Sequence, residues 1–281
     1  MNHITLKKYH GLGNDYLVLD PNKNDIALQR RNIEMLCRRN FGVGADGILY
    51  GPLRENGRIR VRIFNPDGSE AEQSGNGVRI FAKYLLDEGY IREREVTLDM
   101  LAGEVEVKFL QEDGNMMRVN MGRPMYAGPQ MKLNGLEGEV VNAHLRFWDN
   151  VYNTTCLSVG NPNCVIMVEE VTPQKAKLLG PHVEKASYFP ERMNMQLCKV
   201  IDRENIAIEI YERGAGYTLA SGTGACAAAA AANRMGLVGS KVTVHMQGGD
   251  LDVEFDEEGR IYMTGSVELV GTFTLAEHFF S

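Results

Sequence analysis

The chain has 281 residues, of which 44% are hydrophobic and 24% charged, and its formal net charge is −7. This composition is that of a globular protein with a sizeable core, and no basic tract exceeds a few residues, which argues against nucleic acid as the main partner. No apolar run approaches the ~18 to 20 residues that a membrane span needs, and the N-terminus has no hydrophobic signal core, so we expect a cytoplasmic protein and no membrane partner. The five cysteines are odd in number and scattered, and the six histidines lack metal-ligand spacing, so we expect no disulfide framework and no metal.

The first part of the chain predicts more strands than helices. A strand and a turn ending in Gly13-Asn14 are followed by helix signals in parts of 25–40, and then by the alternating segment RIRVRI at 58–63. Ser74-Gly75-Asn76-Gly77 opens the run VRIFAKYLLDEG, which has the length and composition of a helix. The segments EVTLDM and AGEVEVKF then predict two further strands.

A stretch near residues 118–145 has Gly and Pro but little periodicity, and it is typical of a linker. Beyond it the same elements recur: Gly160-Asn161, helix signals at 172–180, the alternating strand 206–210, and Ser221-Gly222-Thr223-Gly224 ahead of ACAAAAAANRMG. Strand patterns in KVTVHM and GGDLDVEF follow. The tail VGTFTLAEHFF ends in apolar residues and is expected to dock on the body of the protein.

The two halves coincide at one offset. Ser221 follows Ser74 by 147 residues (221 − 74), and the same shift superposes Gly13-Asn14 on Gly160-Asn161 and Gly89 on Gly236. We therefore predict a duplication and an α+β fold of two pseudo-symmetric domains, each a mixed, mostly antiparallel barrel-like sheet around a central apolar helix. The predicted domains are residues 1–120, with the tail 270–281 docking on them, and residues 121–269.

Each S-G-x-G turn predicts an anion site. A Gly-rich turn ahead of a helix leaves backbone N–H groups pointing outward, and the helix dipole adds partial positive charge. A carboxylate fits such a place. Two such turns at matched positions favour a small anionic ligand shared by two helix ends.

Polar residues gather at equivalent points of both halves. They are Asn14 and Asn161, Asn65 and Glu212, and Asn76 and Thr223, together with Arg213 and Asn194. A single Asn in a Gly-rich turn usually serves its own backbone, but so many in matched loops favour a ligand. A carboxylate for the arginine and helix ends, with an ammonium for the glutamate and amide oxygens, describes an amino acid.

The segments HGLGNDY, FNPDGSEAEQSGNG, SVGNPN, FPERMN and YERGAGYTLASGTGACA resemble diaminopimelate epimerase along nearly the whole chain. The resemblance implies cofactor-free racemisation in a cleft between two domains, with one acid/base residue from each domain; a homodimer is what it suggests. By this resemblance Gly75, Asn76, Gly222 and Thr223 hold the reacting carboxylate, and Asn14 and Glu212 line the pocket. The resemblance also implies that the distal end of the substrate is bound by Asn65, Asn161, Asn194 and Arg213.

The chain departs from this family where chemistry is expected. Ser74 and Ser221 stand where the family has its two acid/base cysteines, Asn163 replaces a histidine near the reaction centre, and Tyr217 replaces a glutamate. A thiol with a pKa of ~8.5 can be brought near neutrality by a helix N-terminus, whereas a serine hydroxyl needs an adjacent base. We therefore expect weak α-proton exchange, or none.

Three explanations stay open. The serines could be an engineered pair that traps substrate, although Asn163 and Tyr217 argue against this. The chain could be an isomerase or dehydratase with altered chemistry, in which Glu212 and Tyr217 are the candidate acid/base groups. It could also epimerise slowly, or only bind an amino acid. The prediction that summarises these observations is a cofactor-independent amino-acid epimerase or racemase resembling diaminopimelate epimerase, in the lysine and peptidoglycan precursor route.

Overall fold

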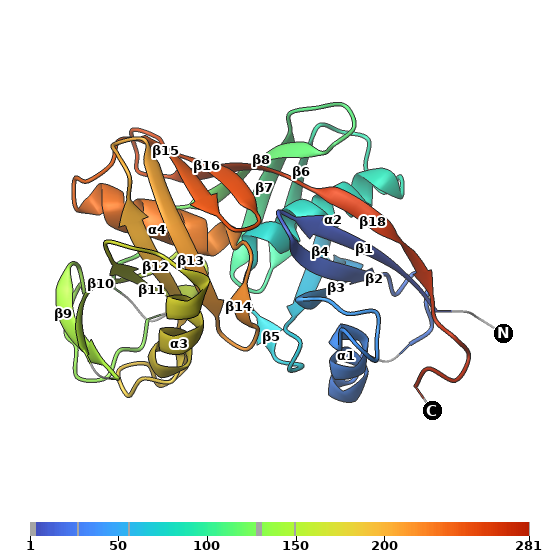
Figure 1. The fold of residues 1–281 in the computed structure, drawn as a ribbon. Coiled ribbons are helices and arrows are strands. Elements are labelled where there is room, and N and C mark those ends of the chain that lie inside the picture. Colours follow the sequence, from blue (N-terminus) through green and yellow to red (C-terminus); the bar gives the residue numbers. More distant parts are fainter. Residues whose placement is uncertain (1–3, 27, 56, 128–130, 149, 281) are drawn as a thin grey trace. The chain divides into compact units, whose positions relative to one another are not determined.

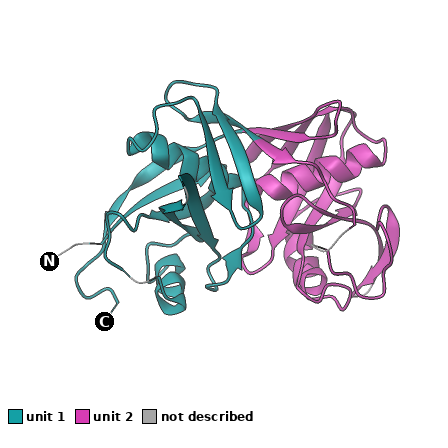
Figure 2. Ribbon diagram, turned by 180° about the vertical axis from the view of Figure 1, so that it is seen from behind, with its two compact units in different colours: residues 1–119, 265–281 teal, residues 120–264 magenta. Residues whose placement is uncertain are grey.

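The computed structural model describes residues 4–26, 28–55, 57–127, 131–148 and 150–280. The chain divides into two compact units, residues 1–119 with 265–281 (unit 1) and residues 120–264 (unit 2) (Figure 2). The sequence places the domain boundaries between residues 120 and 121 and between residues 269 and 270. These domain boundaries remain a prediction.

Unit 1 is built on a mixed sheet. Neighbouring strands follow the order β18-β1-β2-β3-β4-β6-β7-β8, with β5 also paired to β4; β2–β3 and β4–β6 are parallel pairs, and the other pairs with a described register are antiparallel. The helix α1 follows β2, and α2 follows β5. The bounds are β1 (Thr5–Gly11), β2 (Asn14–Leu19), α1 (Arg30–Cys37), β3 (Gly47–Glu55), β4 (Arg58–Phe64), β5 (Glu70–Ala71), α2 (Gly75–Asp87), β6 (Glu95–Met100), β7 (Gly103–Phe109), β8 (Met116–Gly122) and β18 (Glu268–Thr274).

Unit 2 repeats this topology element by element. Its order is β9-β10-β11-β12-β13-β15-β16-β17, with β14 paired to β13, and the parallel pairs β11–β12 and β13–β15 hold the same places as those of unit 1. The predicted α+β duplication is thereby confirmed. The bounds are β9 (Ala143–Phe147), β10 (Asn150–Ser158), β11 (Pro162–Met167), α3 (Pro173–Glu184), β12 (Asn194–Val200), β13 (Asn205–Glu212), β14 (Gly216–Thr218), α4 (Gly222–Arg234), β15 (Lys241–Met246), β16 (Gly249–Phe255) and β17 (Ile261–Ser266).

The helices α2 and α4 are the central elements of their units (Figure 1). Each has 13 residues, and their first residues, Gly75 and Gly222, are 147 positions apart. Strands β10 to β13, β15 and β16 all contact α4, and residues 222–232 of this helix are buried. A helix apolar on all sides needs cover on all sides, and the alanines of α4 let those strands approach closely.

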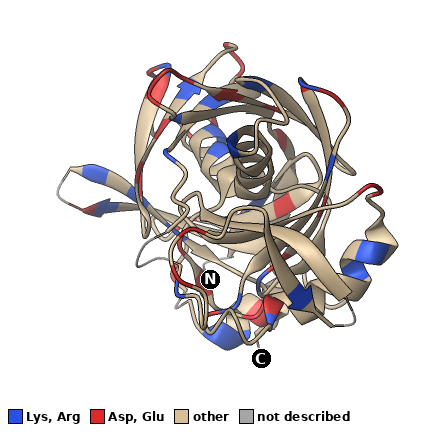
Figure 3. Ribbon diagram, turned by 90° about the vertical axis from the view of Figure 1, so that its left-hand side faces the viewer, with Lys and Arg blue, Asp and Glu red and all other residues tan. Residues whose placement is uncertain are grey.

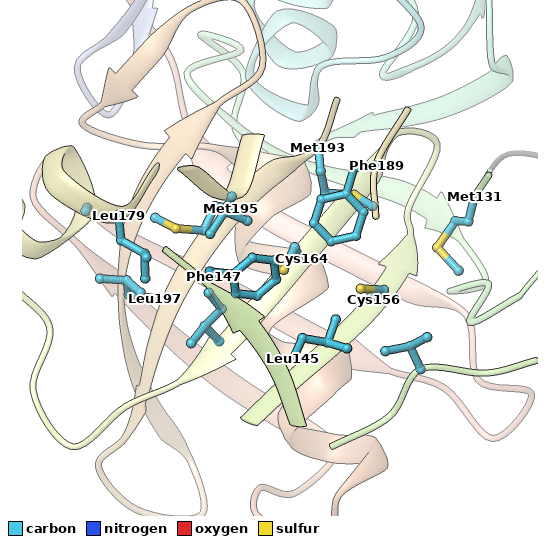
Figure 4. Packing of buried hydrophobic residues seen from close by; sticks show 14 residues of the cluster. Met131, Leu145, Phe147, Cys156, Cys164, Leu179, Phe189, Met193, Met195 and Leu197 are labelled. Atoms are coloured by element: carbon cyan, nitrogen blue, oxygen red, sulfur yellow. The ribbon is translucent and has the colours of Figure 1, made fainter. Parts of the chain in front are cut away.

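Each unit has its own apolar core. In unit 2, Phe147 and Cys164 lie among Phe189, Met195 and other buried residues (Figure 4). In unit 1, Leu275 belongs to a cluster with Leu6 and Leu17, and β18 pairs with β1. The C-terminal segment is therefore part of the structure of unit 1.

The stretch expected to be a linker contains the end of β8 and the start of β9. Between them Met131 and Val140 are buried in the core of unit 2, and residues 128–130 lie outside the described part of the chain. Charged residues of both signs lie on strands, helices and loops (Figure 3), and some form cross-strand pairs such as Lys241–Glu254. In the part of the chain that the structure describes, no helix is both long and apolar enough to span a membrane.

Candidate functional site

Two serines cap the central helices with nearly the same geometry. Ser74 (φ −140°, ψ 119°) accepts a hydrogen bond from the Gly77 N–H at 3.0 Å, and Ser221 (φ −144°, ψ 121°) accepts one from the Gly224 N–H at 3.2 Å. Both are N-caps, so each S-G-x-G turn forms the start of a helix as expected. A Cβ added at Gly77 or Gly224, the third residue of each helix, would lie 3.1 Å from the Cβ of its cap serine, which explains the glycine at this place.

The cap of α4 carries a carboxylate. The Ser221 hydroxyl donates to Glu212 Oε1 at 2.7 Å. Glu212 ends β13 and pairs with Gly216 of β14, and this hairpin brings the glutamate back beside the cap. Serine thus has at this cap the adjacent base that a hydroxyl nucleophile or proton carrier needs. The sequence indicated both residues but not their contact.

The cap of α2 carries a phenol instead. The Tyr16 hydroxyl and Ser74 Oγ are 3.0 Å apart, and Tyr16 on β2 is 6% exposed. Its ring packs against Gly47 of β3, where an added Cβ would come within 2.6 Å of Tyr16 Cε1. Sequence analysis missed Tyr16, because one aromatic in the apolar strand NDYLVL is typical of a core residue. The 147-residue offset could have found it: position 16 corresponds to 163, where the resemblance implies a histidine and this chain has Asn163.

A chain of buried amides lies behind the cap of α4. Asn161 Nδ2 donates to Thr223 Oγ1 at 3.1 Å, and Asn163 Nδ2 donates to Asn161 Oδ1 at 3.0 Å. Gln196 Nε2 in turn donates to Asn163 Oδ1 at 3.0 Å. The four side chains are buried, so these bonds fix the orientation of each amide.

Unit 1 has the matching arrangement. Asn76 Nδ2 donates to Asn14 Oδ1 at 2.9 Å, and Asn14 Nδ2 donates to Asp46 Oδ2 at 2.9 Å. The wholly buried guanidinium of Arg79 donates to Asn76 Oδ1 at 2.6 Å. Within each unit the structure therefore brings together two of the predicted site residues, Asn14 with Asn76 in unit 1 and Asn161 with Thr223 in unit 2.

The amides of unit 1 rest on a charged group. Arg39 bridges Asp15 and Asp46, with N–O distances of 2.7 Å to each, and Lys8 adds an ion pair to Asp15 at 2.8 Å. Burial opposes ionisation of Asp15, but the bonds from Arg39 and Lys8 outweigh it and hold its pKa below the usual value. Burial and the charge of Asp15 raise the pKa of Asp46.

The residues expected at the distal end of a substrate have structural partners in this chain. Asn65 Nδ2 donates to Ser69 Oγ at 3.0 Å within a turn that links β4 to β5. Asn194 Nδ2 donates to the Pro162 carbonyl at 2.9 Å, and its Oδ1 accepts from the Arg213 N–H at 2.9 Å. The structure thus joins Asn194 to Arg213, while Asn65 lies in the other unit.

Tyr217 has a carboxylate partner of its own. Its hydroxyl donates to Glu209 Oε2 at 2.7 Å, and Glu209 also accepts from Gln247. Burial, followed by this bond and the charge of Glu209, raises the pKa of Tyr217. A phenol held by a carboxylate in this way gives up its proton less readily than a free one.

The family model of diaminopimelate epimerase matches residues 6–127 and 155–270. The chain therefore belongs to the diaminopimelate epimerase family. It is 42% identical over 275 residues to "Diaminopimelate epimerase 2" of Nostoc sp., an alignment that covers 98% of this chain and 96% of that relative. It is 40% identical to the diaminopimelate epimerase of Moorella thermoacetica, over 92% of this chain and 94% of the relative.

Solved structures share the fold of this family member at lower identity. A hydroxyproline epimerase from Agrobacterium vitis has a TM-score of 0.71 at 15% identity, covering 100% of this chain and 93% of that one. A predicted epimerase from Pseudomonas aeruginosa has a TM-score of 0.66 at 18% identity, covering 97% and 99%. Methylitaconate-delta-isomerase has a TM-score of 0.59 at 11% identity, covering 98% and 96%. At these identities the likeness establishes the fold, which serves more than one chemistry.

Proposed function

We propose that this protein is a cofactor-independent amino-acid epimerase that interconverts LL- and meso-diaminopimelate by moving the α-proton. The observation that carries the proposal is the 2.7 Å bond from the Ser221 hydroxyl to Glu212 at the N-terminus of α4, because it pairs a cap serine with a base. Relatives with about 40% identity over nearly their whole length carry the name diaminopimelate epimerase and support the choice of substrate.

The substrate carboxylate would bind the N-termini of the central helices. The backbone N–H groups there are oriented outward from the first turn, and the helix dipole favours an anion. In this proposal Gly75, Asn76, Gly222 and Thr223 hold the reacting carboxylate. Asn14 and Glu212 line the pocket, and the distal amino-acid end is bound by Asn65, Asn161, Asn194 and Arg213.

Serine makes the proposed reaction slow. A hydroxyl gives up its proton far less readily than a thiol, whose pKa of about 8.5 a helix N-terminus can lower further. Glu212 compensates in part, because its carboxylate can take the Ser221 proton as Ser221 Oγ takes the α-proton. A thiol at each cap would need no such relay.

The test is solvent exchange at the α-carbon. LL- and meso-diaminopimelate are incubated in D2O with the parent protein and with the Ser74→Cys/Ser221→Cys variant, and loss of the α-proton is followed by NMR. We expect measurable exchange by the parent and exchange at least 100-fold faster by the variant, in the range over which positioned acids and bases act. Exchange by the variant alone would remove the claim of native epimerase activity.

A non-catalytic amino-acid-binding protein is the second candidate, and the absence of both cap thiols favours it. It would bind diaminopimelate with the same amides and helix ends but leave the α-proton in place. Calorimetry separates the two: saturable binding without exchange identifies a binder, and no binding of either isomer excludes diaminopimelate as the ligand. A diverged isomerase or dehydratase would instead convert another amino-acid-like compound, and the same NMR measurement in D2O with that compound would detect it.

A further inference from the structure

Two cysteines face each other across neighbouring strands of unit 2. Cys156 on β10 and Cys164 on β11 are directly opposite in the antiparallel register, and both side chains are fully buried. Both belong to the apolar cluster that contains Phe147 and Phe189 (Figure 4). A hydrogen bond joins the two thiols, so each has the other as a close neighbour.

The register makes these cysteines the closer of the two kinds of antiparallel pair. The N–H of Cys156 donates to the Val140 carbonyl at 2.8 Å and therefore points away from β11. The N–H of Ser158, two residues further along the same strand, donates to the Met125 carbonyl at 2.7 Å, which agrees with this orientation. The backbones of Cys156 and Cys164 are thus not hydrogen-bonded to each other. The Cα atoms of such a pair are about 4.5 Å apart, within the range of roughly 4.4 to 6.8 Å that disulfides span.

The other three cysteines have different neighbours. Cys198 on β12 lies opposite Met167 of β11 and Ile208 of β13. Cys37 ends α1 in unit 1, and Cys226 lies within α4. The structure describes all five cysteines as free thiols, and the strand register brings one pair of them together.

We propose that Cys156 and Cys164 form an oxidation site, at which a small peroxide converts the two thiols into a disulfide that closes the β10–β11 hairpin. The inference goes beyond the proposed epimerase function and does not depend on it. The disulfide would restrain the turn at residues 159–161, which carries Asn161, and the Asn161 amide donates to Thr223. Because the site consists of two thiols in the reduced protein, it is compatible with the expected lack of a disulfide framework.

The atoms and electrons of this step balance with the peroxide as oxidant. One thiolate attacks a peroxide oxygen, the O–O bond breaks, and a sulfenic acid forms as hydroxide leaves. The second thiolate attacks the sulfenic sulfur, the S–S bond forms, and a second hydroxide leaves. The two thiol protons combine with the two hydroxide ions. Two thiols and one hydrogen peroxide therefore give one disulfide and two water molecules, with two electrons passing from sulfur to oxygen.

Burial controls the rate of this oxidation. Burial, followed by the hydrogen bond and the charge of Cys156, raises the pKa of Cys164 well above its usual value, and the thiolate is the reactive form. The oxidant therefore reaches the pair through local opening of the hairpin. We expect a slow reaction that becomes faster at urea concentrations below the unfolding midpoint.

The test counts free thiols. The whole protein is incubated with hydrogen peroxide, alone and in urea below the midpoint, and is then unfolded, alkylated with iodoacetamide and mapped by mass spectrometry. We expect the number of alkylated cysteines to fall by two, from five to three, with a peptide that links Cys156 to Cys164 and full recovery after dithiothreitol. Five alkylated cysteines under every condition, overoxidised cysteines without a link, or a link that involves any other cysteine would overturn the proposal.

Cys198→Ala is the matched control, because it removes another buried thiol from unit 2. The peptide that links Cys156 to Cys164 should still form in this variant. In Cys164→Ala no link should form, and dimedone should trap the sulfenic acid of Cys156. A disulfide from Cys156 to another cysteine in Cys164→Ala would show that the strand register does not select the pair.

Hydrogen exchange tests what the disulfide does to the hairpin. In the oxidised protein, the amides of residues 154–166 should exchange more slowly than in the reduced protein, because the cross-link restricts local opening. Cys164→Ala treated with peroxide should show no such slowing. Unchanged exchange in the cross-linked protein would overturn the closure of the hairpin, whatever the protein does to an amino-acid substrate.

Discussion

At the scale of a single side chain, each cap serine both caps a helix and contacts a second polar side chain. The hydroxyls of Ser74 and Ser221 close the first turn of a buried helix, and they also contact the side chains of Tyr16 and Glu212, respectively. A serine oxygen has one proton and two lone pairs, so it can serve a backbone N–H and a catalytic partner together. Stability and reactivity therefore depend on the same two atoms and can be separated only by choosing the substitution.

Ser74→Ala should lower the free energy of unfolding by about 1 kcal/mol, the usual cost of losing an N-cap oxygen. The Gly77 N–H loses its acceptor, while the backbone of α2 is otherwise unchanged. Urea denaturation followed by circular dichroism measures the loss. Ser240→Ala, at an exposed serine outside any helix, should change the value by less than about 0.5 kcal/mol; equal effects would contradict the capping role.

Arg39→Ala should destabilise the protein in a pH-dependent way. The folded-state pKa of Asp15 lies below its unfolded value, despite burial, because of hydrogen bonds from Arg39 and Lys8. This contribution to stability is present above the unfolded pKa of about 3.9 and is lost as the pH falls through the folded pKa. The variant should be about 2 kcal/mol less stable than the parent at pH 7, and the gap should persist down to about pH 4 and narrow as the pH falls below about 3.9. A gap that widened at acid pH would contradict the assignment.

The positions of strands and helices could be predicted from the sequence, but most contacts between these elements could not. Periodicity and the 147-residue offset located α2 and α4, because a cap, an apolar run and a terminal glycine are all local signals. The contact of Glu212 with Ser221 depends on a hairpin and has no local signature. Tyr16 was missed because burial by itself explains an aromatic in a strand. Asn65 was predicted to bind a ligand, and its amide donates a hydrogen bond to Ser69 within its own turn. The sequence pattern cannot distinguish an Asn that stabilises its own turn from an Asn that binds a ligand.

One close approach between elements can be tested directly. The helix α3 packs on β13, the strand that carries Glu212, and a Cβ added at Gly180 would lie 2.2 Å from Tyr211 Cγ. Gly180→Ala should therefore destabilise the protein by about 1 to 3 kcal/mol, since overpacking outweighs the gain of about 1 kcal/mol in helix propensity. Gly239→Ala is the control, because the nearest atom to its added Cβ is 3.6 Å away. Stabilisation by Gly180→Ala would show that the ring of Tyr211 moves aside freely.

Duplication of one structural unit explains the architecture of the whole chain. Both units use the same strand order, with parallel pairs at the same two places and a buried helix that starts from a serine cap. The copies have diverged at the caps, where Ser74 contacts the Tyr16 hydroxyl and Ser221 donates to the Glu212 carboxylate. The duplicated fold thus presents the same helix start with a phenol beside it in one unit and a carboxylate beside it in the other.

The C-terminal segment should stabilise the unit that holds the N-terminus. Leu275 is 7% exposed within the core of unit 1, just after β18, which pairs with β1. Leu275→Ala should cost about 2 to 3 kcal/mol through the cavity it leaves. In hydrogen exchange followed by mass spectrometry, we expect protection to fall in β1, β2 and β18 and to persist in α4. Val270→Ala, at a side chain 52% exposed on β18, should leave protection unchanged. An equal loss of protection in α4 would contradict the prediction, because it would mean that both units open in one cooperative step.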